Sequence, residues 1–130
     1  MTVPAELKYS KDHEWVSVVS PKEVRIGITD FAQRQLGDVV FVEQPKKGDR
    51  FDSSRSFATV ESVKAVSEIY MPVDGTIVAV NELLADEPEL INTDPYGDGW
   101  IVQVAPSRMK DLDQLLSAAQ YEKLLGSEED

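Results

Sequence analysis

The sequence predicts a mainly β fold in which two similar half-units form a quasi-symmetric sandwich, with a short internal helix and helices at the carboxyl end. Runs rich in β-branched and aromatic residues recur between short turn-forming segments, which is typical of strands. Two segments, 37–43 and 75–81, share the pattern glycine, polar, β-branched, Val, variable, Val, polar. Helical spacing of apolar residues is confined to 31–36 and to the region after 106. The alternative for the repeat is that any two strands preceded by glycine look alike.

The amino-terminal half is expected to form a hairpin, a short helix and a further strand. Residues 1–6 make a short polar start. The helix, 31–36, can be capped at its start by Thr29 or Asp30 and ended by Gly37. The expected strands and the turns that follow two of them are, in order, strand 15–19, turn 20–23, strand 24–28, strand 39–43 and turn 45–49.

The centre of the chain is expected to form a hairpin with Lys64 at its turn. Strands are predicted at 57–62 and 66–73, on either side of this lysine. The two copies of the repeated pattern bracket the hairpin, and two such half-units would make a quasi-symmetric sandwich. After the second copy, we expect an acidic loop at 81–90, a turn-rich segment at 92–99 and a last strand at 100–104.

The carboxyl end is expected to be helical. A helix opening at Pro106 and Ser107 would present one apolar face, formed by Met109, Leu112, Leu115 and Leu116. The segment from Ser117 to Gln120 looks like a capping box for a second helix, which Gly126 would end.

Length and composition predict one globular domain. The chain has 130 residues, of which 42% are hydrophobic, which suits one sizeable core. We expect a single domain over 1–130, with a core at about 7–105 and a C-terminal helical segment at about 107–125, and we expect a monomer.

Charge and residue usage exclude several classes of function. Thirteen basic and twenty-four acidic side chains give a formal charge of -11, which argues against nucleic acid and anionic membrane as partners and favours partners with basic docking faces. The chain has no cysteine and one histidine, so we expect no disulfide framework and no metal site. No apolar run is long enough for a membrane span and no signal peptide is visible, so we expect a cytoplasmic protein.

Lys64 is the residue on which a functional prediction depends. A lysine held at a hairpin turn keeps its ammonium in water, where a second protein can approach it from several directions. Most such lysines are nevertheless plain surface charges. Local sequence alone therefore leaves modification and simple solvation both open.

The segment 61–65, Glu-Ser-Val-Lys-Ala, resembles the lipoylation site of the glycine cleavage system H-protein family. Gly48, Glu61 and Gly75 stand at the positions that this family keeps around its lysine. Beyond the site, the resemblance covers most of the chain apart from its two ends, and it is carried by 8–9, 13–15, 27–30, 36–43, 90–92, 95–97 and 99–100.

The resemblance implies a barrel-sandwich hybrid, the fold of lipoyl and biotinyl carriers, and lipoic acid attached covalently to Lys64. It makes Gly48, Glu61 and Gly75 part of what a lipoate-attaching enzyme recognises, the glycines through the backbone turns that present the hairpin. Glu14 is implied to lie in a cleft that receives the arm, which is the lipoyl group on Lys64 carrying an aminomethyl group. There the Glu14 carboxylate would pair with the amine of the aminomethyl group and shield it from hydrolysis.

Two neighbours of that glutamate are candidates for other roles. Asp12 departs from the small hydroxyl residue expected at its position, so the resemblance implies no role for it in the cleft. His13 could serve as an acid or base, but a lone histidine without a paired nucleophile is more often structural.

The resemblance also implies the partners and the activity. The carrier would accept the aminomethyl group of glycine from the pyridoxal-phosphate-dependent glycine decarboxylase (P protein). It would then visit the aminomethyltransferase (T protein) and finally the dihydrolipoyl dehydrogenase (L protein). No phosphate loop, catalytic triad or metal cluster is visible, so we expect no catalysis by the chain itself.

Two alternatives stay open. One is a lipoyl or biotinyl domain of a 2-oxo acid dehydrogenase or carboxylase, although biotin sites usually place methionine where Val63 and Ala65 stand. The other is an H-like lipoyl relay, or an unmodified regulatory protein on the same fold. We expect a bacterial cytoplasm as the location, with a mature mitochondrial form as the alternative.

Overall fold

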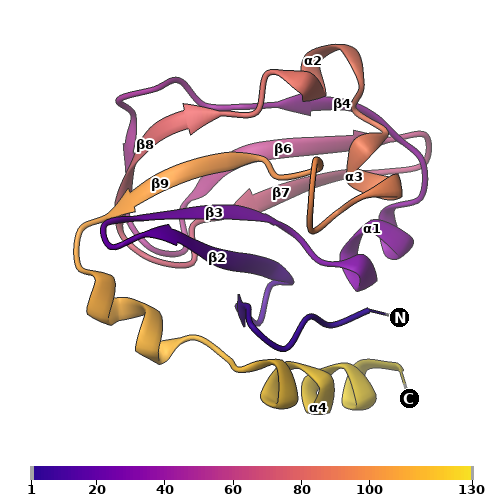
Figure 1. The fold of residues 1–130 in the computed structure, drawn as a ribbon. Coiled ribbons are helices and arrows are strands. Elements are labelled where there is room, and N and C mark those ends of the chain that lie inside the picture. Colours follow the sequence, from indigo (N-terminus) through magenta and orange to yellow (C-terminus); the bar gives the residue numbers. More distant parts are fainter. Residues whose placement is uncertain (1, 130) are drawn as a thin grey trace.

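The computed structural model describes residues 2–129 and has two antiparallel sheets packed face to face (Figure 1). The larger sheet has the strand order β1-β2-β3-β9-β8-β5, and the smaller one has the order β4-β6-β7. The strands of the larger sheet are, in that order, Lys8–Tyr9, Glu14–Ser20, Glu23–Ile28, Val102–Pro106, Gly75–Val80 and Arg50–Phe51. The strands of the smaller sheet are Val39–Glu43, Ser56–Ser62 and Val66–Tyr70.

The mainly β architecture and the lysine hairpin are confirmed. β6 and β7 pair antiparallel, with Glu61 opposite Val66 and Val60 opposite Ser67. β7 ends at Tyr70, three residues earlier than expected. The two copies of the repeated pattern form β4 and β8, which lie in different sheets.

The core lies between the sheets because inward and outward positions alternate along each strand. Val60 is fully buried, whereas its neighbour Glu61 is exposed. Side chains from both sheets meet in the main cluster, which includes Val16, Ile26, Val60, Ile69, Ile77 and Val104.

Helix α1, Asp30–Leu36, begins and ends where its sequence predicts. The Thr29 hydroxyl accepts a hydrogen bond from the Ala32 amide at 3.3 Å, so this side chain is the N-cap. Gly37 ends the helix with φ +80°, a conformation that favours glycine, and its amide donates to the Gln33 carbonyl.

Two short helices lie where loops were expected. The segment between β8 and β9 contains α2, Leu83–Asp86, and α3, Leu90–Thr93, so the prediction of an irregular 81–99 segment is wrong. Each helix is one turn and too short for a visible periodicity. Both are held by burial, because Leu84 and Ile91 are buried in the core.

The carboxyl end differs from its prediction in two ways. The first predicted helix is a 3-10 helix, η1, Met109–Gln114. The second helix, α4, Ala118–Glu129, continues through Gly126, so this glycine does not end it. Its capping box is confirmed, because the Gln120 side chain accepts from the Ser117 amide at 2.9 Å and the Ser117 hydroxyl accepts from the Gln120 amide at 3.2 Å.

Helix α4 lies below β2 in Figure 1. It packs the carboxyl end of the chain against the amino-terminal strand β1. Tyr121 stacks on Tyr9 with ring centroids 4.6 Å apart. Just before the helix, Leu116 exchanges two backbone hydrogen bonds with Tyr9, at 2.7 and 2.9 Å. These contacts form a second apolar cluster beside the main core. No helix in the described part of the chain has the length and apolar character that a membrane span requires.

Candidate functional site

The turn that carries Lys64 is organised by the side chain of Ser62. This serine is buried, and its hydroxyl accepts from the Ala65 amide at 3.1 Å and from the Lys64 amide at 3.4 Å. Its backbone amide donates to the Ala65 carbonyl at 2.8 Å. These local bonds close the turn and leave the lysine side chain outside it.

A second loop supports the turn from the side. The Asp38 carbonyl accepts from the Val63 amide at 3.0 Å. Asn92 of α3 fixes this loop on both sides of Asp38, because its side chain donates to the Gly37 carbonyl at 2.9 Å and accepts from the Val39 amide at 2.8 Å. Asn92 therefore holds the hairpin turn indirectly, through the loop.

The Lys64 side chain is exposed and leaves the turn above Gly37. A Cβ on Gly37 would lie 3.4 Å from the Lys64 Cε, so the glycine leaves room for the lysine stem. Gly37 also has a positive φ, which favours glycine at this position. Within residues 2–129, no hydrogen bond or ion pair engages the Lys64 ammonium. The amine is therefore available to another molecule.

Glu14, at the start of β2, is a buried carboxyl group. It is 1% exposed, and the Ser10 hydroxyl donates to its Oε1 at 2.5 Å. The Tyr70 amide, at the end of β7, donates to its Oε2 at 3.4 Å. Burial raises the pKa of Glu14 to about 7, and the negative charge of Asp12 adds to the rise, whereas the two hydrogen bonds oppose it.

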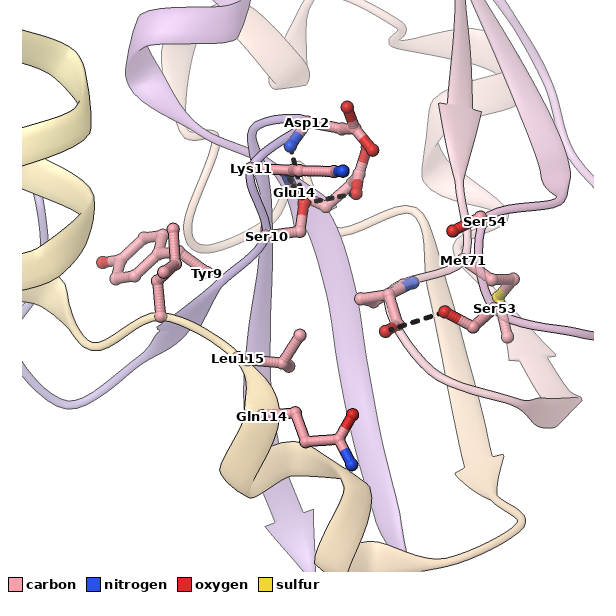
Figure 2. A pocket seen from close by; sticks show the side chains of 12 residues that line it. Tyr9, Ser10, Lys11, Asp12, Glu14, Ser53, Ser54, Met71, Gln114 and Leu115 are labelled. Atoms are coloured by element: carbon pink, nitrogen blue, oxygen red, sulfur yellow. Dashed lines mark hydrogen bonds between the residues drawn. The ribbon is translucent and has the colours of Figure 1, made fainter. Parts of the chain in front are cut away.

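Two cavities lie beside Glu14 and beside strand β7 of the lysine hairpin. The first, about 230 Å³, lies over Glu14 and is walled by residues from distant parts of the chain, including Ser54, Met71 and Leu115 (Figure 2). The second, about 190 Å³, lies between α1 and β7 and has mostly apolar walls, including Phe31, Leu36 and Ile69. Asp12 lines both cavities.

His13 lines the second cavity, and its ring is held by contacts with other parts of the protein. Its Nδ1 is 2.8 Å from the Tyr121 hydroxyl, which also lies 2.7 Å from the Thr29 hydroxyl. The imidazole packs on Phe31 with centroids 4.7 Å apart. His13 has φ +71°, and its backbone carbonyl accepts from the Thr29 amide, so it serves the turn before β2 and the docking of α4.

The structure brings only some of the predicted site residues together. Glu61 is exposed on β6, three residues before Lys64 and on the same hairpin. Gly48 and Gly75 lie elsewhere. Gly48 has φ +97° and donates from its amide to the Ile77 carbonyl at 2.8 Å, and Gly75 begins β8 at the opposite end of the hairpin.

Several residues that shape the site were missed by the sequence reasoning. Ser10, Ser62, Tyr70 and Asn92 act through hydrogen bonds to the two predicted residues or to the loop that supports them. Only Ser62 carried a local signal, since a serine at a tight turn commonly bonds to nearby backbone.

Comparison with known proteins decides the family. The family model described as glycine cleavage H-protein matches residues 7–128. The chain belongs to this family. A glycine cleavage system H protein of Anoxybacillus flavithermus is 50% identical over 128 residues, with 98% of this chain and all of that protein covered. A second one, from Geobacillus thermodenitrificans, is 54% identical over 121 residues, which cover 93% of this chain and 94% of that protein.

A solved structure confirms the fold. The crystal structure of a glycine cleavage system H protein from Mycobacterium marinum superposes with a TM-score of 0.87 at 39% identity, covering 95% of this chain and 99% of that one. The barrel-sandwich architecture of the H-protein family is therefore also that of this chain. Its function is that of the family, a non-catalytic lipoyl carrier in glycine cleavage.

The residues of the site fit a lipoyl group. An attachment site needs a primary amine that an enzyme can reach, and Lys64 offers one without a competing partner among the described residues. From Val66 to Tyr70, β7 makes four steps of about 3.3 Å, or about 13 Å, from the hairpin turn to the Glu14 carboxyl. A lysyl-lipoyl side chain has about a dozen bonds of roughly 1.5 Å, so a zigzag reach of about 15 Å matches this length.

Proposed function

We propose that Lys64 is the residue that carries the lipoyl group. The observation that carries the proposal is the pair of cavities, one against β7 of the lysine hairpin and one over the buried Glu14, which share Asp12 as a lining residue. For attachment, the ε-amine forms an amide bond with the carbonyl carbon of an activated lipoate, the activating group leaves, and the nitrogen loses a proton. When bound, the lipoyl group supplies a disulfide that accepts the aminomethyl group and two electrons.

Glu14 is the residue that holds the amine end of the loaded arm. The apolar walls of the α1–β7 cavity suit a hydrocarbon stem, and the Glu14 carboxyl, which lines the other cavity, suits an ammonium group. The buried position excludes water from the aminomethyl carbon. Because an ammonium favours the charged carboxylate, its arrival lowers the pKa of Glu14 and releases the proton that the empty pocket holds near neutral pH.

The carrier role of Lys64 also implies the partners. The carrier receives its aminomethyl group from the P protein, presents it to the T protein, and is reoxidised by the L protein, after a lipoate-attaching enzyme has modified it. Glu61, Gly48 and Gly75 serve recognition by that enzyme, the first from the hairpin itself and the two glycines through the backbone that presents it. The relatives described above are bacterial, which supports a bacterial cytoplasm as the location.

An intact mass measurement tests the attachment site. The protein is co-expressed with a lipoate ligase, with Lys64→Arg as the test variant and Lys47→Arg, at another exposed turn, as the matched control. We expect one lipoyl group on the wild type and on the control, none on Lys64→Arg, and a tryptic map without cleavage after Lys64. A lipoyl group on Lys64→Arg would contradict the proposal.

A glycine-exchange assay with the P protein separates glycine cleavage from the alternatives. The modified wild type should support exchange of bicarbonate into glycine. A modified protein that supports no exchange, while a control H protein does, would instead indicate a lipoyl relay or a lipoyl domain that serves 2-oxo acid dehydrogenases.

A further inference from the structure

The outer face of the three-stranded sheet carries exposed apolar side chains next to Lys64, on either side of Glu61. Phe41 lies opposite Glu61, which lies opposite Val66, so their side chains form one row across the sheet. Phe41 is 53% exposed and Val66 is 66% exposed. Large apolar side chains so exposed and so close together are typical of a surface that a partner covers.

Two more apolar residues extend this row toward the turn. The register of β4 and β6 shifts between Val39 and Phe41, which places Val40 as an extra residue that is 49% exposed. Val63, next to Lys64 in the turn, is 71% exposed. We call the five residues Val40, Phe41, Glu61, Val63 and Val66 the tip face.

Beside the tip face, the next row of the same sheet is acidic. Glu43 lies opposite Thr59, which lies opposite Glu68, and neither row contains a lysine or arginine. A complementary surface would place apolar side chains against the tip face and basic side chains farther out, against this second row.

We propose that the tip face is the docking surface for the enzyme that attaches lipoate to Lys64. This inference rests on the assignment of Lys64 as the attachment site. The attaching enzyme must bring the Lys64 amine itself into its active site, and a lysine stem of about five bonds reaches only about 6 Å from its Cα. The surface of the attaching enzyme must therefore contact this protein around the lysine turn, where the tip face lies.

The enzymes of glycine cleavage have a weaker requirement for this face. They act at the end of the arm, which lies about 10 Å farther from the backbone than the lysine amine. Their active sites can be reached without contact between their surface and the tip face. The attaching enzyme is the occupant that the geometry favours.

The test compares initial rates of lipoylation of the full-length unmodified protein by a purified lipoate ligase with lipoate and ATP. The variants are Phe41→Ser and Val66→Ser, each of which removes an apolar side chain from the tip face. The matched control is Val18→Ser on β2, because Val18 is 57% exposed and lies in the other sheet. Thermal unfolding of each variant confirms that the fold is kept.

We expect each tip-face variant to lower kcat/KM about tenfold, mainly through KM, and the control to stay within about twofold of the wild type. Glu43→Gln combined with Glu68→Gln should make the rate less dependent on salt. Wild-type rates for both Phe41→Ser and Val66→Ser would overturn the inference. A wild-type protein that is not modified, while another H protein is, would overturn the attachment site itself.

Discussion

The buried Glu14 carboxyl makes a quantitative prediction about stability and pH. Its pKa is about 7 in the folded protein, raised by burial from the ordinary 4.5 of an exposed glutamate. Because the folded state binds the proton more tightly, the stabilisation is fully present below pH 4.5 and is lost as pH rises toward 7. The difference between the two pKa values corresponds to about 3 kcal/mol, most of which, about 2 to 3 kcal/mol, is lost between pH 5 and pH 8.

Glu14→Gln isolates this effect, because glutamine has the same shape and does not titrate. The free energy of unfolding is measured by urea denaturation of the unmodified wild type and the variant at pH 5 and pH 8. We expect the variant to gain about 2 to 3 kcal/mol relative to the wild type on going from pH 5 to pH 8. Glu43→Gln, at an exposed position on β4, should show no comparable gain. An equal wild-type-to-variant difference at both pH values would refute the reasoning that burial raises the pKa of Glu14 to about 7.

Three further substitutions test the scaffold. Gly75→Ala should destabilise the protein by about 1–3 kcal/mol in urea unfolding, because its Cβ would lie 2.6 Å from the Val104 Cγ1. Tyr121→Phe should cost about 1 kcal/mol and lower the melting temperature, since it removes the hydroxyl that bonds Thr29; an unchanged melting temperature would contradict this. Asn92→Ala leaves the loop after α1 without two hydrogen bonds, so amide exchange in the lysine turn should accelerate while the amides of β2 stay protected.

The longer strands and α1 could be predicted because their signals are local, whereas the two-residue strands β1 and β5 were missed. The β-branched runs beside Lys64 and the Thr29 cap with Gly37 each specify structure over a few neighbouring residues. Helices α2 and α3 could not be predicted, because one turn of helix is stabilised by the burial of Leu84 and Ile91 in a core formed by other segments.

The carboxyl end shows how a spacing can favour the wrong element. Met109, Leu112 and Leu115 recur every three residues, which is the period of a 3-10 helix rather than of an α-helix. Gly126 was expected to end α4, but it has no positive φ and is a residue within the helix. A Cβ at this position would contact no other atom within 4 Å. A glycine ends a helix only when the chain turns there, and the sequence does not show that turn.

The site was partly predictable, because some of its residues stand in local patterns and others are brought in only by the tertiary fold. Lys64 and Glu14 stand in recognisable segments, but the geometry that joins them is tertiary. The carboxyl of Glu14 accepts a hydrogen bond from the amide of Tyr70, 56 positions away. Leu115 completes the wall of the cavity over Glu14. No local pattern in the sequence links these residues.

The pairing of Tyr9 with Leu116 and Tyr121 also has a consequence for biosynthesis. A chain that emerges amino end first can form its hairpins early, including the pairing of β1 with β2, but Tyr9 gains its contacts with Leu116 and Tyr121 only after the last segment has left the ribosome. Since Leu115 and Leu116 wall the cavity over Glu14, that cavity is completed last. A nascent chain truncated before these residues would form the lysine hairpin without the completed cavity over Glu14.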